Sequence, residues 1–356
     1  MISLWKQFLQ AFVILALTLA ATLAAWRWTA QQAETLESIR FHQIADEAVN
    51  ELRDRMDGYN QLLLSGSALL EASDEVTRQE WKRFIVRLDL AHRYPGTQGV
   101  GYAIRVKRQQ WSAHEREIRA EGFPDYAIRP QGVRDEAFPI VFIEPFSGRN
   151  LRAFGYDMFS EPVRHAAMAR ARATGQPTLT GKVVLVQEAE GDEQPGVLLY
   201  LPYYDAHVLE RSGPQAALLG FVYSPLRMGD LVRGVLGARL GHICFQIYDG
   251  GAESGGLLFA NAECKAGRYA SETHVDMFGR QWILRVQSTP GLDDEISSRR
   301  SKFILGAGGV ISVLLVWAVM SMQAERRRRL ALVRALADLE VARAEAAGAA
   351  AAKGRF

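Results

Sequence analysis

The sequence predicts an α+β protein that has a long stalk helix, two tandem domains built on antiparallel sheets, and a transmembrane helix on either side. Three observations lead to this prediction. Two charge-free apolar runs lie near the two ends of the 356-residue chain. A helical apolar repeat follows the first run, and short apolar strands alternate with helices through the middle of the chain. Such a mixture of strands and helices is typical of α+β folds.

The first apolar run, residues 8–25, is close to the roughly 20 residues that span a bilayer core. A cleaved signal peptide is the alternative, but the apolar part of such a leader has only about 7–15 residues. The run also continues directly into a helical pattern. We therefore predict a cytoplasmic N-terminus at residues 1–7 and an uncleaved transmembrane helix at 8–28.

The second apolar run, residues 303–322, is followed by four consecutive arginines at 326–329. Arginines at one end of a span mark its cytoplasmic side. We therefore expect residues 29–300 to lie outside the membrane. Residues 323–356 should form a cytoplasmic helix, because they are rich in alanine and leucine.

Residues 29–72 are predicted to form the stalk helix. Apolar side chains recur there at spacings of four and three, which is the pattern of a heptad seam: Ala45, Val49, Leu52, Met56, Tyr59 and Leu63. Such a seam either pairs with a second copy of the chain or packs on its own domain. We expect a homodimer through the stalk helices.

A first domain is predicted at residues 73–210. Its short opening helix is expected to be capped by Ser73 or Asp74. A later helix is expected to have Ser160 as its cap, Pro162 in its first turn and Gly175 at its end. The predicted strands of this domain are residues 96–106, 137–146, 176–188 and 196–205.

A second, smaller domain is predicted at residues 211–300. It is expected to open with a strand at 215–225 and a short helix at 226–237. The remaining predicted strands are 242–250, 256–263 and 280–289.

The residue pattern contains few candidates for catalysis. It holds no phosphate-binding loop, dinucleotide fingerprint or nucleophile elbow, and the seven histidines have no metal-site spacing. We therefore expect no metal, cofactor or catalytic residue. Glu144 and Asp157 as paired carboxylates of a hydrolase are the enzymatic alternative. The near-neutral net charge of +2 argues against nucleic acid as a partner. Cys244 and Cys264 are either a disulfide or two free thiols.

One part of the chain resembles a known family. The run "FPIVFIEPFSGRNLRAFGYDMFS", the helix exit "ARATGQPTLTG" and the strand "GVLLYLPYYD" are similar to the CHASE domain, with the match covering roughly residues 95–210. This is the extracytoplasmic sensory domain of bacterial histidine kinases and cyclases and of plant cytokinin receptors. The resemblance implies a membrane-distal PAS-like domain with a ligand pocket, a membrane-proximal PAS-like domain and a dimer.

The resemblance also implies a site. Asp157 matches the aspartate that hydrogen-bonds an adenine ring in the plant receptors, and Leu179 matches a backbone contact to that ring. Phe142 and Leu201 fall on strands that line the same cavity. The expected ligand is therefore a small molecule, either purine-like or another small amphipathic compound. The structural alternative for Asp157 is hydrogen bonding to backbone N–H groups near the following helix.

These features together predict a receptor in the bacterial inner membrane, with a periplasmic sensory domain. The last residues, "AAAKGRF", resemble the segment before the phospho-accepting histidine of sensor kinases. We therefore expect a histidine kinase output, absent from this chain, with a diguanylate cyclase as the alternative. A ligandless envelope scaffold is a further alternative.

Overall fold

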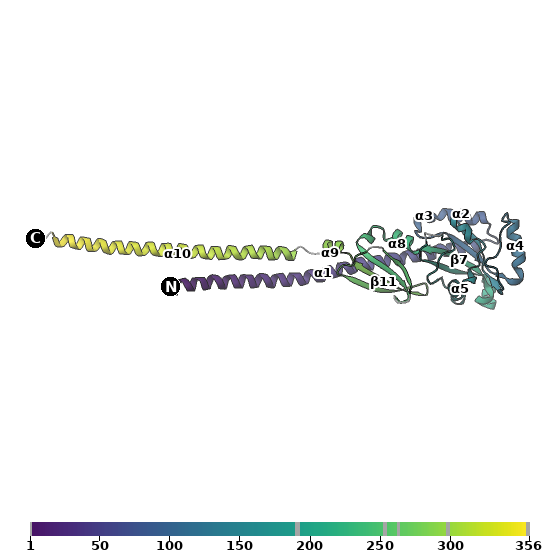
Figure 1. Cartoon of the computed structure of the whole chain (residues 1–356), viewed down its shortest axis with the longest axis horizontal. Coiled ribbons are helices and arrows are strands. Elements are labelled where there is room, and N and C mark those ends of the chain that lie inside the picture. Colours follow the sequence, from purple (N-terminus) through teal and green to yellow (C-terminus); the bar gives the residue numbers. More distant parts are fainter. Residues whose placement is uncertain (1, 189–192, 252–254, 262–263, 297–299, 354–356) are drawn as a thin grey trace. The chain divides into compact units, whose positions relative to one another are not determined.

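The computed structural model describes residues 2–353, except for 189–192, 252–254, 262–263 and 297–299. It divides into two compact units. Unit 1 comprises Met1–Ile39 and Ser297–Phe356, and unit 2 comprises Arg40–Ile296. The elements can be followed by label and colour in Figure 1.

Unit 1 consists of the whole of α10 (Arg300–Lys353) and the N-terminal part of α1 (Ile2–Glu71). Both helices contain a stretch that is long and apolar enough to cross a membrane. They pass close to each other at Gly308, where an added Cβ would collide with the side chain of Thr22. A residue without a side chain therefore permits this approach. The predicted helical continuation of the second apolar run is confirmed.

Helix α1 continues without a break from the first apolar run through the predicted stalk residues as far as Glu71. All six residues of the predicted seam are buried there. The seam packs on its own domain, which was one of the two alternatives. Polar contacts fix the same helix: Arg55 Nη1 donates to Arg93 O at 2.7 Å, and Tyr203 Oη donates to Leu70 O at 3.1 Å.

Two short helices, α2 (Arg78–Leu88) and α3 (Leu90–Arg93), follow α1. The predicted cap of α2 was wrong, because the N-cap is Thr77 and not Ser73 or Asp74. Thr77 and Glu80 form a capping box, in which each side chain accepts from the backbone N–H of the other residue.

An antiparallel five-stranded sheet has the order β4-β1-β7-β6-β5. Its strands are β1 (Val100–Ile104), β4 (Ile140–Glu144), β5 (Thr178–Leu179), β6 (Gly196–Tyr204) and β7 (Leu218–Arg227). The strand predicted at 215–225 does not open a second unit. It is β7, the middle strand of this sheet, with Tyr223 opposite Tyr200 of β6. The strand predicted at 176–188 is reduced to the two residues of β5.

Helices and short strands connect these strands. They are β2 (Val106–Lys107), η1 (Arg108–Gln110), α4 (Trp111–Ala120), β3 (Glu136–Ala137), η2 (Gly148–Ala153), η3 (Met158–Ser160), α5 (Pro162–Thr174), α6 (Ala206–Ser212) and α7 (Pro214–Ala217). The predicted Ser160 cap of α5 was wrong. Glu161 is the N-cap, and its carboxylate accepts from Val163 N and Arg164 N, whereas Pro162 and Gly175 lie where predicted.

A second antiparallel sheet has the order β10-β11-β8-β9. Helix α8 (Met228–Leu236) and turn η4 (Gly237–Gly241) precede it, and α9 (Pro290–Ile296) follows it. Its strands are β8 (Ile243–Asp249), β9 (Leu257–Ala260), β10 (Ala270–Met277) and β11 (Arg280–Ser288). The sequence analysis missed β10. A disulfide joins Cys244 of β8 to Cys264, which settles the open question about the two thiols.

The core of unit 2 lies on two faces of the five-stranded sheet. One cluster joins α1 and α2 to β6 and β7, and it extends to Trp282 and other side chains of the second sheet. The other cluster lies on the opposite face, among α5, η2 and η3. Alternation along β6 separates them, because Leu199 and Leu201 belong to the first cluster and Leu198 and Tyr200 to the second.

Replacing Leu52 of α1 by alanine should lower the free energy of unfolding by about 2–5 kcal/mol, because a fully buried leucine would leave a cavity. Leu64→Ala in the same helix is the matched control, since Leu64 is 42% exposed and both changes keep a good helix former. Urea unfolding of the detergent-solubilised chain, followed by tryptophan fluorescence, measures both. An equal decrease in the free energy of unfolding in the two variants would contradict the packing of α1 described above.

Replacing both Cys244 and Cys264 by alanine should lower the free energy of unfolding by about 3 kcal/mol, because the crosslink closes a chain segment of 20 residues. The same unfolding assay measures this change. Reduction of the wild-type chain with dithiothreitol should reproduce it and should leave the double variant unaffected. If dithiothreitol also destabilises the double variant, the reductant acts on something other than this disulfide.

Candidate functional site

Asp157 is fully buried at the start of η3. Its Oδ1 accepts two backbone hydrogen bonds, from Phe138 N at 2.8 Å and from Phe159 N at 3.0 Å. The first of these ties the carboxylate to the residue just after β3, and the second caps η3. The geometry around Oδ1 therefore fits a structural role for Asp157, in which its carboxylate accepts hydrogen bonds from backbone N–H groups.

The other oxygen of Asp157, Oδ2, faces one side chain. Arg134 Nε lies 2.9 Å from it, but without the alignment of a hydrogen bond. Arg134 is in the loop between α4 and β3, and its neighbour Val133 is 94% exposed. Its guanidinium also lies 5.4 Å from the centre of the Trp111 ring. The carboxylate is thus covered by a cation from a surface loop.

Burial raises the pKa of Asp157 above its ordinary value of 3.8. The two backbone N–H groups and the Arg134 guanidinium act in the opposite direction, because they stabilise the charged form. The raised pKa means that the contact with Arg134 does not fully offset the loss of hydration.

Other aromatic and cationic side chains lie on this face of the sheet. Tyr200 Oη donates to Met158 Sδ at 3.3 Å, and Arg164 Nη1 donates to Tyr156 Oη at 3.0 Å. Tyr223 is fully buried, and its hydroxyl has no hydrogen-bond partner in the described part of the chain. A buried hydroxyl of this kind marks a place where a further polar group can be accommodated.

The other three predicted site residues do not join Asp157. Phe142, Leu179 and Leu201 all pack in the cluster that contains α1, on the other side of the sheet. Phe142 stacks on Trp81 of α2, with the ring centres 5.7 Å apart. Leu179 N donates to Phe278 O at 3.1 Å and so connects β5 to the turn between β10 and β11.

Phe142 lines a cavity of about 350 Å³ beside α2, which sequence reasoning did not identify. Arg78 and Lys82 are its cationic lining residues. The Arg78 guanidinium lies 4.7 Å from the Phe123 ring and 5.3 Å from the Phe142 ring. Arg78 Nε also pairs with Glu121 at 2.7 Å. Glu144 lines the same cavity. Since Asp157 is fully buried in the opposite cluster, the two carboxylates lack the shared, solvent-accessible site that a hydrolase needs.

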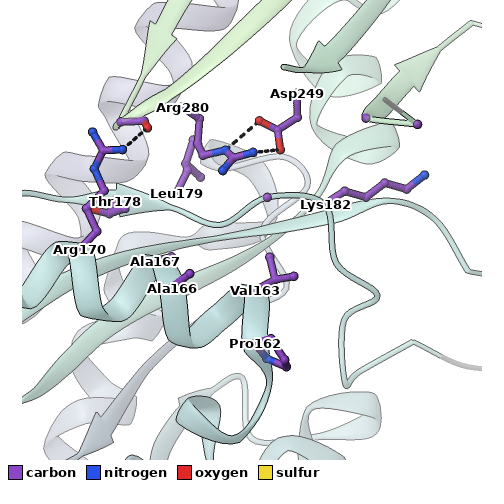
Figure 2. A pocket seen from close by; sticks show the side chains of 14 residues that line it. Pro162, Val163, Ala166, Ala167, Arg170, Thr178, Leu179, Lys182, Asp249 and Arg280 are labelled. Carbon is purple, nitrogen blue, oxygen red and sulfur yellow. Dashed lines mark hydrogen bonds and ion pairs between the residues drawn. The ribbon is translucent and has the colours of Figure 1, made fainter. Parts of the chain in front are cut away.

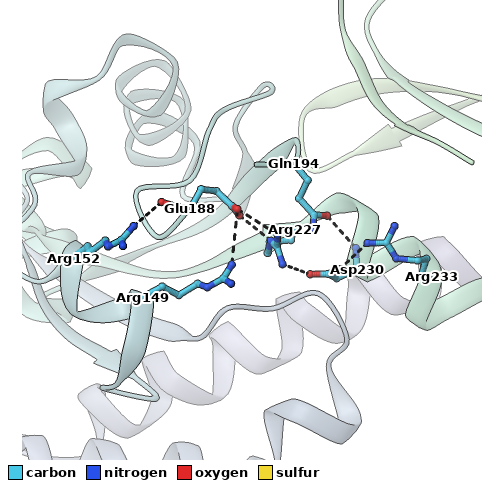
Figure 3. A network of polar contacts seen from close by, with 7 residues as sticks. All are labelled: Arg149, Arg152, Glu188, Gln194, Arg227, Asp230 and Arg233. Carbon is cyan, nitrogen blue, oxygen red and sulfur yellow. Dashed lines mark hydrogen bonds and ion pairs between the residues drawn. The ribbon is translucent and has the colours of Figure 1, made fainter. Parts of the chain in front are cut away.

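A polar network links η2 and the segment before β6 to the junction of β7 and α8 (Figure 3). Arg227 donates to both carboxylate oxygens of Glu188, at 2.8 and 3.3 Å, and also to Asp230 at 2.8 Å. Arg152 of η2 donates to the backbone oxygen of Glu188 at 2.9 Å. The segment before β6 is thereby fixed to the start of α8, the helix that leads into the second sheet.

Comparison with known families gives one match. The family model described as CHASE domain matches residues 74–259, which is more than half of the chain. The matched residues include the five-stranded sheet, Asp157, and the second sheet as far as β9. No curated protein matches the chain.

The raised pKa of Asp157 predicts a pH dependence of stability. Between pH 3.8 and the higher folded-state value, the folded chain binds more protons at this group than the unfolded chain does. The contribution of Asp157 to stability should therefore fall as the pH rises through this window. Asp157→Asn keeps an Oδ1 acceptor but cannot titrate, so its stability should not show this decrease with rising pH.

The measurement is the difference in free energy of unfolding between wild type and Asp157→Asn from pH 3.5 to 7. Asp125→Asn is the control, because Asp125 is exposed. A difference that grows in favour of the wild type as the pH rises would mean that the Arg134 contact outweighs burial.

Proposed function

The chain belongs to the CHASE-domain family, and we propose that it is a two-pass receptor of the bacterial inner membrane that senses a small periplasmic molecule. A CHASE domain is an extracellular sensory module, and the two apolar helices on either side of it fit a membrane receptor. Binding would change the conformation of the sensory domain, and this change would reach a cytoplasmic output domain.

The observation that carries this proposal is the continuity of α1. One helix contains the first apolar run and also the buried seam of unit 2. A shift of the seam within the sensory core must therefore move the backbone that leads into the membrane. A ligand can drive such a shift only by binding one arrangement of the core more tightly than another.

Two further features support the proposed topology. The disulfide between Cys244 and Cys264 favours an oxidising compartment such as the periplasm for unit 2. The arginines at 326–329 follow the second apolar run and favour the cytoplasm for the end of α10.

We propose that the ligand is anchored on Oδ2 of Asp157. Oδ1 already accepts from two backbone N–H groups, whereas the contact that Oδ2 makes with the described residues is with the side chain of Arg134. A purine-like molecule with an N–H donor would take the place of this guanidinium. The buried hydroxyl of Tyr223 and the aromatic side chains of the same cluster would then surround the ring.

Phe142, Leu179 and Leu201 receive a different role under this proposal. Their packing in the cluster of α1 places them between the ligand-bearing sheet and the stalk. We assign them to transmission of the change rather than to contact with the ligand.

The two sheets are proposed to be the two PAS-like domains of the family. The boundary between them would then fall after β7 and not at residue 211, because β7 pairs with β1 and β6. We further propose a homodimer through α1, whose side chains Leu36 and Ile39 are exposed apolar groups. The proposed output is a histidine kinase, with a diguanylate cyclase as the alternative.

Ligand binding should be detectable as a rise in melting temperature, since a ligand that binds only the folded state stabilises it. The full chain in lipid nanodiscs would be screened against adenine, other purines and small amphipathic metabolites. For a hit, Asp157→Asn should weaken binding by about tenfold or more, because the amide turns an N–H donor toward the ligand donor. Arg134→Gln should strengthen binding, because it removes the competing cation.

Asp125→Asn is again the matched control and should bind like the wild type. A hit that survives Asp157→Asn unchanged would return Asp157 to a purely structural role. An absence of hits across the library would favour a protein partner or a ligandless scaffold.

A further inference from the structure

A second cavity lies between the two sheets of unit 2 and has a volume of about 800 Å³ (Figure 2). Helix α5 and the residues of β5 and just after it form one side. The end of β8, the two glycines just before β9 and the turn between β10 and β11 form the other. None of the Asp157 contacts described above lies in this cavity.

The described lining of this cavity carries an excess of positive charge. Its charged side chains are Arg170, Lys182, Arg280 and Asp249. Arg280 and Asp249 neutralise each other through two parallel contacts, at 2.8 Å from Nε to Oδ1 and at 2.5 Å from Nη2 to Oδ2. Arg170 and Lys182 thus remain as the cations without a carboxylate partner among the described residues.

Arg170 is held in position at one end of the cavity. Its Nη1 donates to Gly279 O at 2.8 Å, in the turn between β10 and β11. Gly279 has a φ of +79°, and a Cβ there would lie 2.9 Å from the guanidinium carbon of Arg170. A glycine is therefore needed for this approach. The described residues give the guanidinium no other hydrogen bond or ion pair, so its remaining N–H groups can bind a carboxylate.

The two cations come from different segments of the lining, Arg170 from α5 and Lys182 from the residues after β5. Figure 2 shows Arg170 and Lys182 at opposite sides of the view, with Val163 and Ala166 of α5 between them. The middle of the floor is therefore apolar. Two cationic ends joined by an apolar floor match a ligand that has an anionic group at each end and methylene groups between them.

We propose that this cavity binds a small, elongated dicarboxylate. One carboxylate pairs with Arg170 and the other with Lys182, and the methylene chain lies over Val163 and Ala166. The Arg280–Asp249 pair forms the wall opposite α5 and contributes no net charge. Because the cavity is lined by both sheets, the bound dicarboxylate holds them together at the point where Leu179 N already contacts Phe278 O.

Calorimetric titration of the full chain in lipid nanodiscs, at low ionic strength, tests this assignment. The probes are succinate, glutarate and adipate, with butyrate and inorganic phosphate for comparison. At least one dicarboxylate should bind about tenfold more tightly than butyrate and phosphate. Arg170→Gln and Lys182→Gln should each weaken that binding by about tenfold, which corresponds to one lost charged contact.

Arg116→Gln is the matched control, since it removes an exposed arginine of α4 outside the cavity and should leave binding unchanged. Asp157→Asn should also bind the dicarboxylate like the wild type, which separates this site from the proposed sensory site. The proposal is overturned if no dicarboxylate binds, if phosphate or butyrate binds as tightly, or if Arg170→Gln and Lys182→Gln bind normally. Loss of dicarboxylate binding in Asp157→Asn would also overturn it.

Discussion

The burial of one face of α1 is the constraint on which the rest of unit 2 depends. Leu52, Met56 and Tyr59 are fully buried, and removing each such side chain from water is worth about 1.5–3 kcal/mol. The cluster that they enter contains Val222 of the first sheet and Trp282 of the second. Since both sheets share one helix as part of their core, neither can move along it without disturbing the packing of the other.

Charged contacts also fix the relative positions of the segments around this shared core. Glu188 is buried beside Arg227, and Asp249 beside Arg280, and each pair joins segments that are distant in sequence. Because taking both charges out of water is costly, such pairs fix a particular arrangement more than they stabilise it. Asp157 differs from both, because one of its oxygens is committed to the backbone and the other meets a cation from a surface loop. Of the three carboxylates, it is the one whose partner can be exchanged at least cost to the fold.

Periodicity predicted the local elements well, and the tertiary arrangement less well. The seam of α1 and the bounds of α5 followed from spacing and from Pro162 and Gly175, and the Thr77–Glu80 capping box was visible but overlooked. β10 was missed because its polar residues gave no clear apolar pattern. The central place of β7 could not be predicted, since strand order depends on long-range pairing. The family resemblance put Asp157 and Leu201 into one site, although Leu201 packs in the cluster of α1 and the neighbours of Asp157, Phe138 and Met158, pack on the opposite face of the sheet. Nothing local in the sequence connects Asp157 to Arg134.

The order of synthesis gives the shared core a further consequence. The Phe41 ring of α1 stacks on the Tyr269 ring, at a centre-to-centre distance of 5.8 Å, although 228 residues separate the two in the chain. At about 5–20 residues per second, the ribosome needs roughly 10–45 s to supply the second partner after the first. During that interval the apolar face of α1 has no complete partner surface. Under the proposed topology, this apolar face of α1 is exposed beside the translocation channel during export, where it can bind a holding chaperone.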